Sequence, residues 1–114
     1  MGVIEIRSMD EYNQLLKSHR TVVINASAEG YGPCKAMSPV FETSAAENES
    51  DEDKVAFVKF DTDLIPDLAG ELEIRSVPAF FVFESGELVD KMFGANPLGL
   101  NKLVQEAVER SKGE

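Results

Sequence analysis

The chain has almost no cysteine and a shortage of positive charge. Its 114 residues include one cysteine, Cys34. No disulfide can form within such a chain, which excludes a small secreted scaffold held together by disulfides. Against 21 aspartate and glutamate residues stand 11 lysine and arginine residues, for a formal net charge of −10. Because phosphate backbones and anionic lipids repel this charge, neither nucleic acid nor a membrane surface is an expected partner.

Long apolar runs are also missing, as is any clustering of metal ligands. No stretch is long enough to span a membrane, and the first residues (MGVIEIRSMDEY) lack the basic region and apolar run of a secretory signal. We therefore expect a cytoplasmic protein. The single histidine, His19, and Cys34 fall on different predicted elements, so we expect no metal site and no other cofactor. We interpret His19 as a helix-end residue, favoured there by the helix dipole.

What is present suits one ordinary globular domain. The chain is 43% hydrophobic and 28% charged, so it has enough apolar surface to fold around a core. It contains no internal repeat and no linker-like segment, which predicts a single domain over residues 1–114. The acidic stretch 47–53 (ENESDED) is expected to be a solvated loop.

Strand and helix patterns alternate along the chain. Apolar and β-branched runs predict strands at residues 3–6, 21–26, 55–60, 79–83 and 87–93. Helices are predicted after a capping box formed by Ser8 and Glu11, from Pro33, over residues 64–72, and after Asn96-Pro97. Pro39 is expected to kink the second helix. The order β-α-β-α-β-α-β-β-α predicts an α/β fold in which helices flank a mixed sheet, because helical crossovers imply parallel strands and the final hairpin is antiparallel.

Cys34 belongs to the stretch GYGPCK, residues 30–35, at a strand-to-helix junction. A cysteine in the first turn of a helix lies near unpaired amides and the positive end of the dipole, and Lys35 adds a cation beside it. These conditions favour a reactive thiolate. A lone cysteine is, however, equally typical of a buried core position, so both interpretations remain open from the local pattern.

Six segments in a specific order resemble the thioredoxin family. They are residues 22–28 (VVINASA), 29–39 (EGYGPCKAMSP), 55–63 (VAFVKFDTD), 74–83 (IRSVPAFFVF), 86–87 (GE) and 93–97 (FGANP). The resemblance extends from residue 3 to about residue 111, and FGANP is similar to the same stretch of cytosolic fungal thioredoxins. It implies the thioredoxin fold.

The resemblance also implies a groove for a partner. In the family a cis proline faces the redox site, and the matching residue here is Pro78, preceded by Val77. The backbone of Val77 would then pair with an extended segment of a partner, as an added strand. Gly94 matches the small residue on the other side of this groove, and Gly30 flanks the motif itself.

The active-site motif departs from the family pattern. Where the family usually reads Trp-Cys-Gly-Pro-Cys, this chain reads Gly30-Tyr31-Gly32-Pro33-Cys34. Tyr31 therefore replaces the cysteine that attacks a target disulfide, and Cys34 matches the cysteine that later releases the mixed disulfide. The chain should be unable to run ordinary dithiol–disulfide reduction.

Supporting positions have changed as well. Asn25 matches the buried aspartate that accepts a proton from the second thiol, and an amide has no useful basicity. Its partner lysine is retained as Lys59. Ser27 and Gly30 stand where the family has aromatic residues. Several changes in one neighbourhood indicate a natural lineage that lost the ordinary reductase activity.

Two functions remain open. In the first, Cys34, with Tyr31, Gly32, Pro33 and Lys35 around it, forms mixed disulfides with glutathione or a protein thiol and needs a second thiol for regeneration. In the second, the chain is a redox-silent module that binds extended peptide segments in the groove, with Tyr31 covering Cys34 and serving as an aromatic anchor. We expect a monomer, with a Cys34-linked dimer under oxidising conditions.

Overall fold

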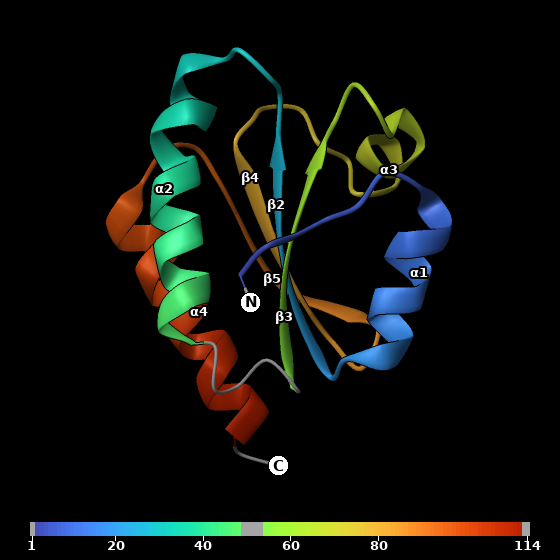
Figure 1. Ribbon diagram of the computed structural model, residues 1–114, viewed down its shortest axis with the longest axis vertical. Coiled ribbons are helices and arrows are strands. Elements are labelled where there is room, and N and C mark those ends of the chain that lie inside the picture. Colours follow the sequence, from blue (N-terminus) through green and yellow to red (C-terminus); the bar gives the residue numbers. More distant parts are fainter. Residues whose placement is uncertain (1, 49–53, 113–114) are drawn as a thin grey trace.

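A five-stranded sheet forms the centre of the computed structural model, which describes residues 2–48 and 54–112 (Figure 1). The strands lie in the order β1-β3-β2-β4-β5. β1 and β2 both run parallel to β3, whereas β4 runs antiparallel to β2 and to β5. The sheet is therefore mixed, as the sequence predicts. The strands are β1 (Ile4–Glu5), β2 (Thr21–Ser27), β3 (Val55–Asp61), β4 (Ala79–Glu84) and β5 (Glu87–Phe93).

Helices cover both faces of the sheet. Figure 1 shows α2 and α4 together on one side and α1 and α3 on the other. Their bounds are α1 (Met9–Ser18), α2 (Gly32–Glu47), α3 (Pro66–Glu71) and α4 (Pro97–Lys112). The predicted order of elements is thereby confirmed. Among the described residues, no helix combines the length and the apolar character needed to cross a bilayer.

β2 separates two apolar cores because neighbouring side chains of a strand point to opposite faces. Val22, Ile24 and Ala26 belong to the core beneath α1 and α3, whereas Val23 belongs to the core beneath α2 and α4. In that second core the ring of Phe41 packs against two aromatic residues of the sheet, Phe57 and Phe80. All of β2 except Ser27 is buried, as its nearly continuous apolar sequence predicts.

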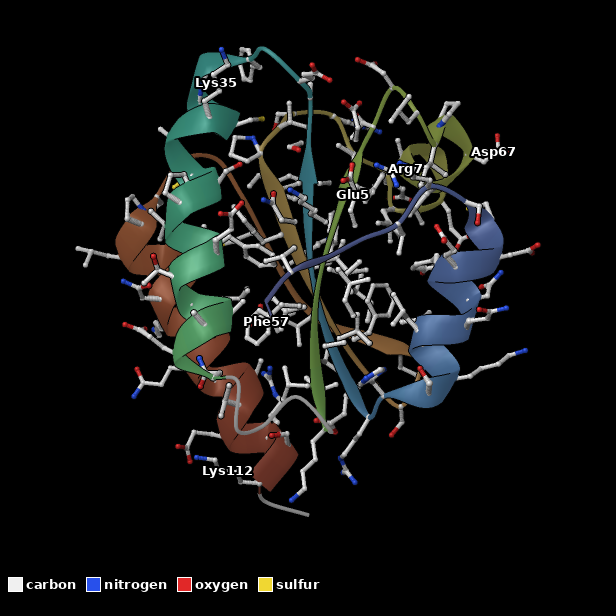
Figure 2. All side chains as sticks on the ribbon, in the orientation of Figure 1. Glu5, Arg7, Lys35, Phe57, Asp67 and Lys112 are labelled. Atoms are coloured by element: carbon white, nitrogen blue, oxygen red, sulfur yellow. The ribbon has the colours of Figure 1, made fainter. Side chains whose placement is uncertain are left out.

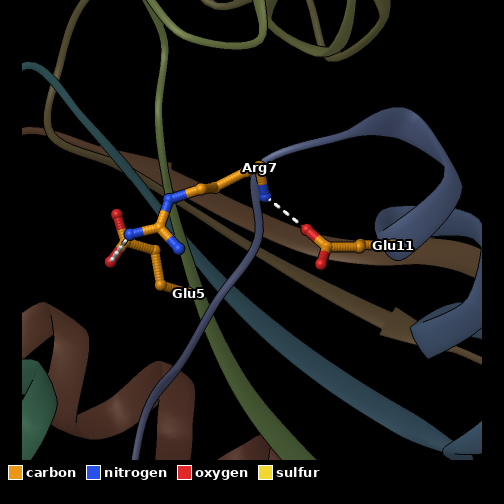
Figure 3. A network of polar contacts seen from close by, with 3 residues as sticks. All are labelled: Glu5, Arg7 and Glu11. Carbon is orange, nitrogen blue, oxygen red and sulfur yellow. Dashed lines mark hydrogen bonds and ion pairs between the residues drawn. The ribbon is translucent and has the colours of Figure 1, made fainter.

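The predicted capping box at the start of α1 is present, with one difference. The Ser8 hydroxyl accepts the backbone N–H of Glu11 at 3.2 Å, and Ser8 is the N-cap. The Glu11 carboxylate reaches back by one residue more than in the usual box and accepts the N–H of Arg7 at 2.6 Å. The Arg7 guanidinium also pairs with Glu5 at 3.4 Å (Figure 3). This network ties the edge strand β1 to the first helix.

The local sequence accounts for the backbone geometry of the hairpin turn and for the start of α4. Ser85 and Gly86 connect β4 to β5 with φ values of 52° and 84°, which is the left-handed geometry of a tight hairpin turn. Asn96 precedes α4, and its side-chain oxygen accepts the N–H of Gly99 at 3.0 Å, as expected of a helix cap. The peptide bond between Val77 and Pro78 is cis, the geometry that the family resemblance implies.

Some predicted boundaries were wrong. α3 begins at Pro66 rather than at residue 64, because a residue before proline is disfavoured in helical geometry and Ile65 has φ −129° and ψ 71°. β1 comprises two residues instead of four, since only Ile4 and Glu5 pair with β3. In the predicted acidic loop, Glu47 is the last residue of α2, and residues 49–53 lie outside the described part of the chain.

Tyr12 supplies a pH-dependent contribution to stability. Burial, together with the charge of Glu71 and a hydrogen bond to it, raises the pKa of Tyr12 from 10.0 to about 12. The unfolded chain therefore releases this proton at lower pH than the folded protein does. The stabilisation is complete below pH 10 and is lost as the pH rises towards 12, with a size on the order of 2 kcal/mol.

Urea unfolding between pH 9 and pH 11.5 measures this effect. The Tyr12→Phe variant should lose less stability across this interval than the unmodified protein, since phenylalanine has no proton to release. Other groups titrate equally in both proteins. Parallel pH profiles for the two proteins would show that Tyr12 ionises alike in the folded and unfolded states.

Candidate functional site

The candidate site lies where β2 ends and α2 begins. Tyr31 is the N-cap of α2, and its carbonyl accepts the backbone N–H groups of Cys34 and Lys35, both at 3.1 Å. Pro33 occupies the first turn of the helix, as predicted, where its missing N–H leaves no intrahelical bond unmade. Tyr31 has no side-chain capping bond, so its ring is not used to start the helix.

Cys34 is buried, with 4% of its surface exposed. Its Sγ accepts the backbone N–H of Ala28, at a donor-to-sulfur distance of 3.5 Å. Ala28 lies in the segment that connects β2 to α2, so the sulfur is held against the loop that precedes its own helix. Cys34 thus has features of both interpretations of the local sequence. It lies at a helix start, as a reactive cysteine would, and it is largely buried, as a core cysteine would be.

The residues beside Cys34 are much more exposed. Tyr31, which the family resemblance matches to the attacking cysteine, exposes 49% of its surface. Lys35 and Gly32 are exposed as well. Gly30 has a φ of 83°, so a side chain there would be strained, although a Cβ would meet no neighbouring atom. The backbone thus favours glycine at a position where the family has an aromatic residue.

The expected groove residues are brought together at the same end of the sheet. Ala26, near the end of β2, pairs with Ala79, so the cis Val77–Pro78 bond lies close to the loop that follows β2. The N–H of Gly94 donates to the Pro78 carbonyl at 2.8 Å. Val77 is half-buried and Pro78 is buried.

Sequence reasoning missed Phe93 beside the expected groove residues. It pairs with Ala79 across β4 and β5, directly before Gly94, and it exposes 43% of its surface. Its ring packs edge-on against Phe81, with 6.0 Å between the ring centroids. The sequence contained a signal: an aromatic residue at the end of the last strand of a hairpin, next to the glycine already identified.

Asn25 and Lys59 are neighbours in the sheet. They face each other across the parallel ladder of β2 and β3, and Asn25 also pairs with Phe80 of β4. Asn25 is 2% exposed, and its Oδ1 accepts no hydrogen bond from any described residue. A carboxylate in that position would be costly to bury without a partner, and the neutral amide lowers this cost.

A surface hollow of about 250 Å³ opens beside the cysteine, and the sequence did not predict it. It lies between the first half of α2 and the neighbouring ends of β1, β2 and β3. We call it the Cys34 hollow. Its lining includes Cys34, Ser27, Gly30, Lys35, Lys59 and Asp61. Ser27 and Gly30 are the two positions that the family resemblance matches to aromatic residues, so small residues stand where the resemblance leads us to expect bulky ones.

The described residues contain no cluster of three metal-binding side chains. His19 is the C-cap of α1, and its ring nitrogen Nδ1 contacts the Ser18 hydroxyl at 2.9 Å. Its position at a helix end is therefore confirmed.

Comparison with known proteins identifies the family. The thioredoxin family model matches residues 3–106. The chain is 35% identical over 103 residues to a thioredoxin of Coprinus comatus, covering 90% of this chain and 95% of the relative. It is 36% identical over 104 residues to thioredoxin-2 of Pyricularia oryzae, covering 91% of this chain but only 58% of that longer protein.

Solved structures agree with this assignment. The crystal structure of Malassezia sympodialis thioredoxin has a TM-score of 0.83 and 34% identity, covering 95% of this chain and 93% of the other. Oxidised mitochondrial thioredoxin 3 of Saccharomyces cerevisiae has a TM-score of 0.79 and 34% identity, covering 91% and 94%. The chain belongs to the thioredoxin family, has its fold, and carries a single cysteine in its sequence.

Proposed function

We propose that the protein forms one mixed disulfide at a time, through Cys34, with glutathione or a protein thiol. The observation that carries this proposal is the contact between the Ala28 N–H and the Cys34 Sγ at the start of α2. A donor directed at the sulfur, in the first turn of a helix, stabilises negative charge there. The thiolate is the form that reacts with a disulfide.

The chemistry requires a disulfide as the oxidant, such as glutathione disulfide. The Cys34 thiolate attacks one sulfur of glutathione disulfide, the bond between the two glutathione sulfurs breaks, and one glutathione leaves as its thiolate. Cys34 and the remaining glutathione then share a new disulfide. A second glutathione thiolate attacks the glutathione sulfur of this adduct, which returns Cys34 to the reduced form and regenerates glutathione disulfide.

Ordinary dithiol reduction does not fit these residues. The chain has no second cysteine to resolve the adduct internally. Asn25 cannot accept a proton as a carboxylate would, and Tyr31 has no thiol with which to attack. The catalytic residues in this proposal are Cys34 and, around it, Tyr31, Gly32, Pro33 and Lys35. The buried Asn25 and the half-buried Lys59 support the site.

A second function is favoured by different observations. Cys34 exposes only 4% of its surface, whereas Tyr31 exposes 49% and Phe93 exposes 43%. In this alternative the cysteine is silent, and the groove of Val77, Pro78 and Gly94 binds an extended segment of a partner. Aromatic side chains anchor such interfaces because they bury a large area at a small cost in entropy.

The proposed setting is the cytoplasm, with the chain acting as a single domain over residues 1–114 and mostly as a monomer. The cytoplasm keeps thiols reduced and supplies glutathione, which the proposed cycle requires. A dimer linked through Cys34 is expected only under oxidation. No cofactor is needed, since the electrons move between sulfur atoms.

Exposure to glutathione disulfide tests the first function. The unmodified protein should gain the mass of one glutathione, as measured by intact mass spectrometry, and should lose it again with excess reduced glutathione. The Cys34→Ser variant is the matched control and should gain nothing. An unchanged mass in the unmodified protein would contradict the proposed mixed disulfide.

Alkylation with iodoacetamide separates the two functions. If Cys34 is the working thiol, the folded protein should react within about tenfold of the rate of the urea-unfolded chain, because a working thiol has to become accessible to its reaction partner. If the groove alone is functional, the folded thiol should resist modification throughout, and Tyr31→Ala should weaken binding of an extended peptide partner.

Restoring the missing sulfur tests the assignment of roles. In a standard disulfide-reduction assay the unmodified chain should be inactive, and Tyr31→Cys should gain activity because it recreates the attacking thiol next to the resolving one. Tyr31→Cys combined with Asn25→Asp should be faster than Tyr31→Cys alone, since the carboxylate accepts the proton. Activity in the unmodified chain would overturn the assignment.

A further inference from the structure

The Cys34 hollow has an unusual balance of charge for this protein. Its lining contains three acidic residues, Glu5, Glu29 and Asp61, and two lysines, Lys35 and Lys59. Lys35 on the first turn of α2 and Glu5 on β1, both labelled in Figure 2, are among the residues that line the hollow. Two lysines beside one cysteine are unusual in a chain of net charge −10. How strongly the hollow attracts an anion depends on which of its charged side chains are already paired within the protein.

Two of the three acidic groups are occupied within the protein. Glu5 pairs with the Arg7 guanidinium at 3.4 Å. The Asp61 carboxylate accepts two backbone N–H groups, from Glu29 at 3.3 Å and from Asp63 at 2.7 Å. Both carboxylates therefore have a structural role at the border of the hollow, which reduces their repulsion of an anionic ligand.

The side chains of the two lysines have no partner within the described part of the chain. Neither the Lys35 nor the Lys59 ammonium group forms an ion pair or a hydrogen bond with another residue in the described part of the chain. Lys59 is half-buried next to Asn25, the 2% exposed residue whose Oδ1 also has no described partner. The exposed Glu29 is the one lining acid whose carboxylate has no described partner. Two ammonium groups and one carboxylate are thus available beside the sulfur.

We propose that the Cys34 hollow is the binding site for the small thiol partner, and that it selects glutathione-type anionic thiols. This inference rests on the proposed mixed disulfide at Cys34. Each half of glutathione disulfide carries two carboxylates and one ammonium, which is the complement of Lys35, Lys59 and Glu29. The volume of about 250 Å³ lies just below the usual range for small-molecule pockets, which suits a tripeptide thiol that remains partly in solvent.

In this arrangement a small thiol and an extended peptide use different entrances. The residues that border the hollow come from α2 and from β1, β2, β3 and the loop after β2, whereas Val77, Pro78 and Gly94 do not line it. The ligand reaches the sulfur over Ser27 and Gly30, where small residues leave room. The groove remains free for a protein segment.

Competing disulfides test the charge selection. The rates of adduct formation with glutathione disulfide, with neutral bis(2-hydroxyethyl) disulfide and with cationic cystamine are measured by mass spectrometry at one pH. The rate with glutathione disulfide is divided by the rate with the neutral disulfide, which cancels any change in the intrinsic reactivity of the Cys34 thiolate. Lys35→Gln and Lys59→Gln should each lower this ratio about threefold, the size expected of a partly exposed ion pair.

The matched control is Lys102→Gln, which removes an exposed lysine of α4 that does not line the hollow. Its ratio should equal that of the unmodified protein. In the Lys35 and Lys59 variants, the rate with cystamine relative to the neutral disulfide should rise. Added salt should reduce the difference in rate between the anionic and the cationic disulfide.

Filling the hollow gives an independent measurement. Ser27→Phe should slow adduct formation with all three disulfides at least about tenfold, and thermal unfolding would verify that this variant is folded. Equal ratios for the lysine variants and the Lys102 control would overturn the hollow as the selecting site while leaving the mixed disulfide intact. Failure of the unmodified protein to react with any of the three disulfides would instead refute the proposed function itself.

Discussion

The two hydrogen-bonded ladders of β2, with β3 on one side and β4 on the other, hold the site together. Parallel pairing with β3 places Asn25 beside Lys59 and Ser27 beside Asp61. Antiparallel pairing with β4 places Ala26 opposite Ala79 and so brings the Val77–Pro78 bond to the end of β2. A slip of one residue in either ladder would turn these side chains to the other face of the sheet. The close packing of Val22, Ile24 and Ala26 in one core and of Val23 in the other opposes such a slip, because each side chain fits its own neighbours.

The end of β2 also sets the position of Cys34. The strand is followed by a short loop and then by α2, so the sulfur returns to a backbone N–H of that loop, at Ala28. The burial of Met37 and Phe41 in the core beneath α2 fixes the rotation of the helix and therefore the direction of its first turn. The chemistry of one thiol depends in this way on apolar packing one and two turns further along the helix.

The residues that the family resemblance matches to the redox positions would have a consistent physical effect. By that match, Tyr31 stands in place of the attacking sulfur, Asn25 in place of a buried carboxylate, and Ser27 and Gly30 in place of bulky aromatic residues. The first two replace reactive groups with groups that need no proton transfer, and the last two leave space next to the remaining thiol. None of the four residues belongs to the two apolar core clusters, although Asn25 is itself buried.

The family, the order of elements, the caps at Ser8 and Asn96, and the position of Cys34 at a helix start all follow from the amino-acid sequence. These depend on local patterns and on spacing along the chain. Folding alone reveals that Cys34 is 4% exposed, that Phe93 exposes 43% of its surface beside Gly94, and that Glu5, Lys35, Lys59 and Asp61 meet around one hollow. The reason is physical: burial and charge pairing depend on side chains from strands and helices that are far apart in sequence, and only the register of the sheet brings them together.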